Sequence, residues 1–191
     1  MGMATLIAGL ALFFAAHSIS IANEGWRDRI VERIGLWQWK GIYSLVSIGG
    51  FVLICWGYGI ARQEPMMLYT SPAWMRHVTM LAMVVVFPLF LAANLPGRIK
   101  SAAKQPLLAA TKIWAFSHLL VNGSLADVLL FGSFLAWAVV DRISMKGRIQ
   151  RPIAAAPASA INDPVAVVVG LIIFGGFVIW GHDALIGVPL F

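Results

Sequence analysis

Charged residues are scarce in this chain of 191 residues. Only 12% are Asp, Glu, Lys or Arg, whereas 60% are hydrophobic, and the mean hydropathy is +0.85. Charged residues make up roughly a quarter of a typical soluble globular domain, so a soluble fold is excluded. The composition indicates an integral membrane protein.

Cysteine and the common catalytic motifs are also missing. The single cysteine, Cys55, excludes an intrachain disulfide and a cysteine-based metal site. The chain offers no Ser-His-acid set, no paired carboxylates, no phosphate-binding loop and no His-Glu-x-x-His spacing. These gaps argue against hydrolytic and phosphate-binding sites and against zinc.

Long apolar runs, by contrast, are abundant. A bilayer core of about 30 Å needs about 20 helical residues. Six runs near this length predict spans at residues 3–22, 41–61, 73–95, 106–121, 125–141 and 163–181. The Asn-Gly pair at 122–123 predicts a tight turn between the fourth and fifth, and Pro88 predicts a kink in the third. We therefore predict an all-α bundle of six transmembrane helices, a single domain over residues 1–191.

The basic residues predict the orientation of this bundle. Of the 14 Lys and Arg residues, 11 lie in the first, third and fifth loops and a twelfth, Lys112, lies near the same side of the fourth span. This bias places those loops in the cytoplasm and both termini in the periplasm. This distribution explains the net charge of +6 without a nucleic-acid partner. The first loop, residues 23–40, predicts an amphipathic helix on the membrane surface. Residues 148–163, rich in Ala and Pro, predict a linker.

Histidines are the candidate functional residues. His17, His77, His118 and His182 all lie inside or at the end of a predicted span, where an ionisable side chain is costly and commonly binds an ion or cofactor. Two to four histidines from separate helices, without a partnering carboxylate, resemble haem ligation more than a zinc site. A structural role remains the alternative, either at the membrane interface for His77 and His182 or as a helix bridge for His17 and His118.

His118 carries the strongest signal. Thr111, Ala115, His118 and Asn122 share one helical face, so small and polar groups lead to the imidazole. Lys112 lies near enough to the cytoplasmic edge for its ammonium group to reach water. A carboxylate of a bound cofactor would be an equally good partner for this charge. Depth in the membrane favours pairing His118 with His77 slightly over pairing it with His17.

Four blocks of the chain resemble the bacterial NnrU family. They are HSISIANEGWRDRIVERIGLWQWKGIYSLVSIGGFVLICWGYG, NLPGRIK, KIWAFSHLLVNGSLADVLLFGSFLAWAVVDR and HDALIGVPLF. The resemblance implies an inner-membrane protein associated with denitrification. The same domain occurs in the plant 15-cis-zeta-carotene isomerase, which holds b-type haem through histidines.

Transferred to this chain, the resemblance implies His17 and His118 as haem ligands, with His77 and His182 in reserve. Two positions depart from the family pattern. Gln105 stands where members often have a histidine, and Ala115 stands where the isomerase has a cysteine. Neither side chain can serve as an axial ligand.

We therefore predict a b-type haem protein of the bacterial inner membrane that supports the production, maturation or electron supply of nitrite and nitric oxide reductases. The reductases or their maturation factors, and the lipid bilayer, are the predicted partners. Two alternatives remain open. One is a haem-dependent cis-trans isomerase of an apolar polyene, and the other is a cofactor-free scaffold or transport component.

Overall fold

The chain folds into helices that form two compact units. A computed structural model describes residues 1–149, 151 and 155–190. Helix accounts for 75% of the described residues, which contain no β-strand. Unit 1 comprises Met1–Ser71 and Asn122–Ile149, and unit 2 comprises Pro72–Val121 and Gln150–Phe191. The all-α prediction is confirmed.

The helices divide between the two units as follows. Unit 1 contains α1 (Gly2–Ala22), α2 (Glu24–Ile34), α3 (Leu36–Ala61) and α8 (Leu125–Ser144). Unit 2 contains α4 (Met75–Met83), α5 (Val86–Ala92), α6 (Arg98–Ala103), α7 (Pro106–Leu119), α9 (Asn162–Gly176), the π-helical turn η1 (Phe177–Gly181) and α10 (His182–Ile186).

Four candidate membrane spans are present among the described residues: α1, α3, α4 with α5, and α9 with η1 and α10. They match the predicted spans at 3–22, 41–61, 73–95 and 163–181, and α3 begins five residues before the predicted start. Large apolar side chains are exposed along these helices, as lipid contact requires. The six-span count is not confirmed. At 14 residues α7 spans about 21 Å, and α8 carries three charged residues within its 20.

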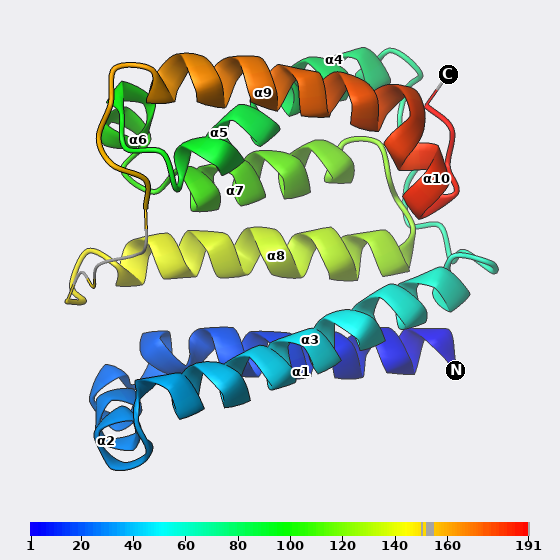
Figure 1. Cartoon of the computed structure of the whole chain (residues 1–191). Coiled ribbons are helices and arrows are strands. Elements are labelled where there is room, and N and C mark those ends of the chain that lie inside the picture. The colour runs from blue at the N-terminus through cyan, green and yellow to red at the C-terminus, as the bar shows by residue number, and fades with distance from the viewer. Residues whose placement is uncertain (150, 152–154, 191) are drawn as a thin grey trace. The chain divides into compact units, whose positions relative to one another are not determined.

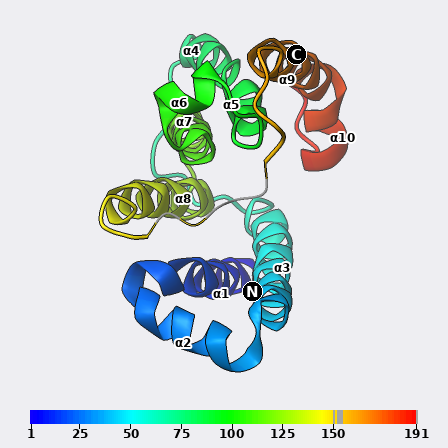
Figure 2. The ribbon, with the colours of Figure 1, turned by 60° about the vertical axis from the view of Figure 1, so that its left-hand side comes forward.

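Helices α1 and α3 run antiparallel and form the closest helix pair of unit 1 (Figures 1 and 2). Glycines spaced seven residues apart on each helix, Gly2 and Gly9 on α1 and Gly50 and Gly57 on α3, make this approach possible. A Cβ on Gly9 would meet the backbone of α3, and a Cβ on Gly57 would meet that of Leu6. Small residues at such contacts let membrane helices pack backbone to backbone. Leu6 is fully buried in this contact.

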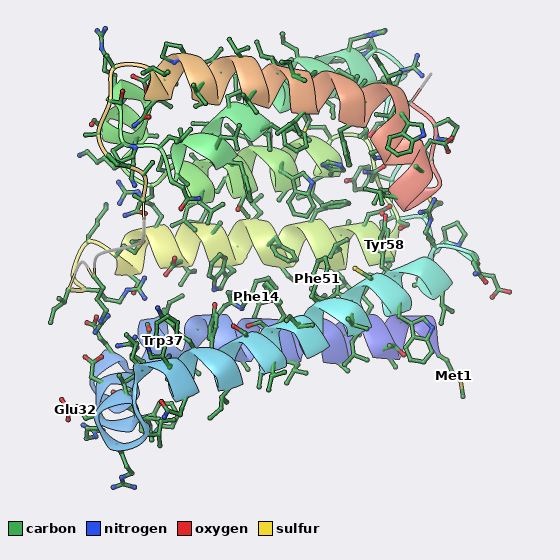
Figure 3. The ribbon with its side chains drawn as sticks, viewed as in Figure 1. Met1, Phe14, Glu32, Trp37, Phe51 and Tyr58 are labelled. Atoms are coloured by element: carbon green, nitrogen blue, oxygen red, sulfur yellow. The ribbon has the colours of Figure 1, made fainter. Side chains whose placement is uncertain are left out.

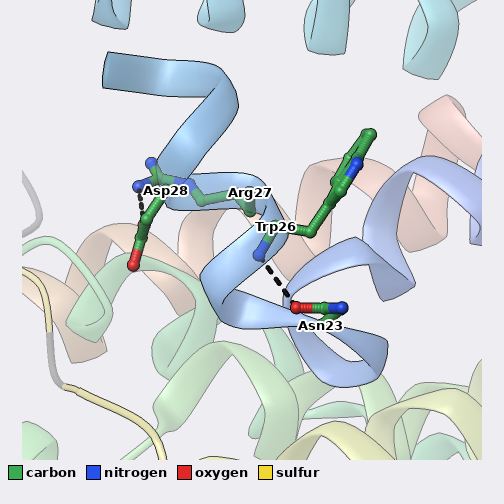
Figure 4. A network of polar contacts seen from close by, with 4 residues as sticks. All are labelled: Asn23, Trp26, Arg27 and Asp28. Carbon is green, nitrogen blue, oxygen red and sulfur yellow. Dashed lines mark hydrogen bonds and ion pairs between the residues drawn. The ribbon is translucent and has the colours of Figure 1, made fainter. Parts of the chain in front are cut away.

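Helix α2 connects this pair and confirms the helix predicted in the first loop. The Asn23 side chain accepts a hydrogen bond from the Trp26 amide, which caps the helix start, and Arg27 pairs with its neighbour Asp28 (Figure 4). None of the α2 residues is buried. Figure 3 shows Glu32 and Trp37 at this end of unit 1, where Lys40 lies over the Trp37 ring, 4.8 Å from its centroid.

The predicted kink in the third span is confirmed. Helix α4 ends at Met83 and α5 begins at Val86, so the break lies one turn before Pro88. Proline has no N–H to donate to the carbonyl of residue i−4, here Val84, which explains this position. The break also serves packing, because Gly170 of α9 approaches the Pro88 backbone too closely for any side chain.

The loop before α6 is held by the start of α9. The Asp163 carboxylate accepts hydrogen bonds from the amides of Arg98 and Ile99 at 2.7 and 3.1 Å. Asn162 donates to the carbonyls of Pro96 and Pro157. Part of the predicted linker at 148–163, residues 150 and 152–154, lies outside the described residues. A surface pocket beside this loop is lined by residues 96–98, 101 and 158–160 and contains none of the predicted ligands.

The turn predicted at Asn-Gly lies between α7 and α8, as expected, but its physical reason is different. Gly123 does not have a positive φ. It is required because the Tyr69 carbonyl lies where a Cβ would be, and the Gly123 carbonyl accepts the amides of Leu68 and Tyr69. Ser124 and Asp127 then form a capping box that starts α8.

Candidate functional site

His17 lies near the end of α1 in an aromatic cluster. Its Nδ1 is 2.8 Å from the carbonyl oxygen of Phe13, and its ring stacks on the Phe13 ring with centroids 3.9 Å apart. A carbonyl can only accept, so Nδ1 carries the proton and donates. A histidine ligand is commonly oriented in this way, with its other ring nitrogen, Nε2, directed to the metal.

Two further helices of unit 1 contribute to what we term the His17 cluster. Tyr43 of α3 and Trp137 of α8 contact the imidazole, with ring centroids 5.1 and 5.7 Å away. The complete cluster consists of Phe13, Phe14, His17, Tyr43, Phe134 and Trp137. Figure 3 shows Phe14 on the side of α1 that faces α8. The imidazole is therefore surrounded by flat, largely apolar rings from three helices.

A charged pair lies beside this cluster. Asp141 follows Trp137 by one helical turn, is buried, and accepts a hydrogen bond from Nη2 of Arg148. Two buried N–H groups here, Nε1 of Trp137 and Nε of Arg148, have no hydrogen-bond partner among the described residues.

His118 lies near the end of α7 in unit 2 and repeats the local geometry of His17. Its Nδ1 is 2.8 Å from the Trp114 carbonyl oxygen, and the Trp114 ring centroid lies 5.4 Å from that of the imidazole. The preceding residue, Ser117, is fully buried, and its carbonyl accepts the Thr79 hydroxyl at 3.0 Å. This bond ties α7 to α4.

The two reserve histidines differ from this pattern. The His77 side chain is exposed on the first turn of α4. His182 begins α10, and its Nδ1 lies 2.7 Å from the Val188 carbonyl oxygen, so it bonds forward along the chain rather than to its own helix. Neither histidine therefore has the i−4 carbonyl bond that His17 and His118 share.

The other predicted cofactor residues have diverse surroundings. Lys112 is half-buried on α7. The expectation that Asn122 continues the helical face of His118 is wrong, because α7 ends at Leu119. The Asn122 carbonyl accepts the Tyr69 hydroxyl at 2.8 Å. Partial burial and the nearby Asp127 charge raise the Tyr69 pKa above its ordinary value.

A profile of the NnrU family, described as NnrU protein, matches residues 5–190 and so runs through both units. This chain belongs to the NnrU family. Comparison with curated proteins and with solved structures gave no match. The family assignment from the sequence blocks is thus confirmed, while the ligand assignment of this NnrU protein stays a prediction.

The residues around His17 are suitable for a haem. The ring is oriented by a backbone bond, its neighbours are aromatic, and an orphaned N–H group lies on an adjacent side chain. The described residues contain no group of three or more His, Cys, Asp or Glu that could hold a bare metal ion. Sequence reasoning missed Tyr43 and Trp137, although Trp137 and Asp141 at i and i+4 signal a shared helical face.

Proposed function

We propose that this NnrU-family protein is a bacterial inner-membrane protein that binds b-type haem and supports denitrification. His17 and His118 are the axial ligands in this proposal, and the nitrite and nitric oxide reductases depend on the protein for production, maturation or electron supply. The observation that carries it is the orientation of both imidazoles by a backbone carbonyl four residues earlier. A histidine held in this tautomer is prepared to bind a metal.

The proposal includes six spans with both termini in the periplasm. Helix α8 is long enough to cross a bilayer, at 20 residues or about 30 Å. Asp127 near its start bonds to Ser124 and Tyr58, and Asp141 near its end pairs with Arg148, so these charges are compensated. Helix α7 is shorter, and local thinning of the bilayer accommodates such a span.

Bound haem would supply one-electron redox chemistry, and the chain would supply the environment. His17 and His118 hold their rings in position through the Phe13 and Trp114 carbonyls. The aromatic rings of the His17 cluster exclude water and lower the local dielectric, which are means by which proteins tune a haem potential. Lys112 would pair with a cofactor carboxylate.

The decisive experiment is a reduced-minus-oxidised absorption spectrum of the purified protein. A low-spin b-type spectrum is expected for the wild type and for His77→Ala, whose exposed side chain makes it a matched control. His17→Ala and His118→Ala should each lose that spectrum, because each removes one axial ligand. A wild-type sample with no iron and no Soret band, prepared so that other membrane haems are retained, would contradict haem binding.

The role in denitrification needs a cellular test. A denitrifying strain that lacks its own family member should lose nitrite and nitric oxide reductase activity, and the wild-type gene should restore both. His17→Ala and His118→Ala should fail to restore them if haem carries the role. Full restoration by both variants would support the cofactor-free scaffold or transport component instead.

The aromatic His17 cluster also favours one alternative, a haem-dependent isomerase of an apolar polyene. Aromatic rings of this kind suit a flat conjugated chain as well as a porphyrin. Chromatography of a cis-carotenoid incubated with the haem-loaded protein would test it. Conversion that disappears in His17→Ala would make the protein an isomerase, and an unchanged isomer ratio would exclude this carotenoid as substrate.

A further inference from the structure

Three buried polar groups of unit 1 have no hydrogen-bond partner within the described part of the chain: the Ser47 hydroxyl, the indole Nε1–H of Trp137 and the Nε–H of Arg148. The last two are N–H groups, which can only donate. An unsatisfied buried donor costs about 1–3 kcal/mol, and folded proteins keep few of them. Donors of this kind are explained when a ligand provides the acceptor.

The arrangement connects both donors with His17. The Trp137 ring lies edge-on to the imidazole, with an interplanar angle of 89°. Asp141, one turn further along α8, pairs with Nη2 of Arg148. Trp137 thus belongs to the His17 cluster, and Arg148 is joined to the same helix through Asp141.

The chemistry of these groups selects a carboxylate as the acceptor. A guanidinium binds carboxylates with several N–H groups at once, and Nη2 of Arg148 is already engaged by Asp141. The arginine can thus hold a second carboxylate through Nε, on the same guanidinium edge as the Nη2 that Asp141 engages. An indole N–H donates only, so it adds to an anionic acceptor and not to a cationic one.

We infer that Trp137 and Arg148 bind a carboxylate of the haem that His17 ligates, so that unit 1 anchors both the iron and the acidic edge of the porphyrin. This inference rests on the proposed function. Both residues are positioning residues, since they contact the ligand periphery and not the iron. A b-type haem has two carboxylates. Lys112 of unit 2 remains the predicted partner of the other one.

The test compares haem with its dimethyl ester, in which both carboxylates are blocked. Each porphyrin is titrated into the detergent-solubilised apoprotein, and the dissociation constant is read from the Soret band. Wild-type protein should bind haem about tenfold or more tightly than the ester, because a hydrogen bond to a charged group contributes roughly that factor. Trp137→Phe and Arg148→Lys should weaken haem binding about tenfold more than they weaken ester binding.

The variants are chosen so that the fold survives. Trp137→Phe keeps an aromatic ring and removes an unsatisfied donor, so the apoprotein should be as stable as wild type or more so. Arg148→Lys keeps the positive charge beside Asp141 and removes Nε. Trp180→Phe, at a side chain that is 75% exposed, and Arg142→Lys, next to Asp141, are the matched controls and should bind both porphyrins as wild type does.

Each outcome decides one of the two proposals. If wild-type protein binds haem and ester equally, or if both variants keep wild-type affinity for haem, the inference is overturned and haem binding stands. If the wild type binds neither porphyrin, the proposed function fails and the inference with it. A selective loss of haem over ester affinity in both variants supports it.

Discussion

His17 and His118 are held on their helices in nearly the same way, while the ring contacts that surround His17 bring in two further helices. Each donates Nδ1–H over 2.8 Å to the carbonyl four residues earlier, and each has an aromatic residue at that position. Around His17, rings come from α1, α3 and α8. Next to His118, the ring contact with Trp114 comes from its own helix.

This difference separates local from tertiary causes. The i−4 carbonyl bond and the aromatic neighbour follow from helix geometry, so any helix with the same pattern produces them. The surroundings of His17 require three helices to approach closely. Disturbing helix contacts in unit 1 should therefore change the environment of the His17 ring and leave that of His118 unchanged. Disturbing contacts in unit 2 should change the environment of His118 and leave that of His17 unchanged.

The largest effect is expected at the α1–α3 contact. A Cβ on Gly50 would lie 2.7 Å from the Phe13 amide nitrogen, so Gly50→Ala must push the two helices apart. We expect a loss of about 3 kcal/mol in the free energy of unfolding and shifted ring-nitrogen NMR signals for His17 but not His118. Its matched control is Gly49→Ala, whose Cβ would meet only Leu12, at 4.0 Å. Equal stability of the two variants would refute the close contact.

A smaller effect is expected from the link between α3 and α8, the helices that carry Tyr43 and Trp137. The Tyr58 hydroxyl donates a hydrogen bond to the Asp127 carboxylate at 2.6 Å, and Figure 3 shows where Tyr58 lies on α3. Tyr58→Phe should cost about 2 kcal/mol, since the lost bond is to a charged group. Tyr69→Phe, which loses a bond to a neutral carbonyl, should cost about 1 kcal/mol. Chemical unfolding in detergent measures both losses of stability. A larger loss for Tyr69→Phe than for Tyr58→Phe would falsify the assignment of the stronger hydrogen bond to Tyr58.

The smallest effect tests the converse in unit 2. Thr79→Val removes the buried hydroxyl that donates to the Ser117 carbonyl next to His118. A loss of about 1 kcal/mol is expected, with changed NMR signals for His118 and unchanged signals for His17. Thr111→Val is the control, because that hydroxyl bonds to a carbonyl of its own helix. A shift of the His17 NMR signals in Thr79→Val would contradict the expectation that changes in unit 2 spare His17.

Much of the fold could be predicted because its signals are local. Apolar length indicated the spans of α1, α3 and α9, Pro88 indicated the break between α4 and α5, and the Asn-Gly pair indicated the turn before α8. Asn122 was misplaced because residue spacing alone does not show where a helix stops. The reason for Gly123 was also hidden, since the Tyr69 carbonyl that excludes a Cβ there is 54 positions away in the chain.

By itself the sequence determined the membrane character, the all-helical fold, the family and the histidines on which the haem proposal rests. These depend on composition, on runs of apolar residues and on motifs within single helices. The tertiary structure alone decided which side chains surround His17, that Gly50 and Gly57 contact α1, and that Trp137 and Arg148 keep buried donors without a partner among the described residues. The reason is physical: contacts between helices join residues far apart in the chain, and their geometry depends on packing that no local pattern encodes.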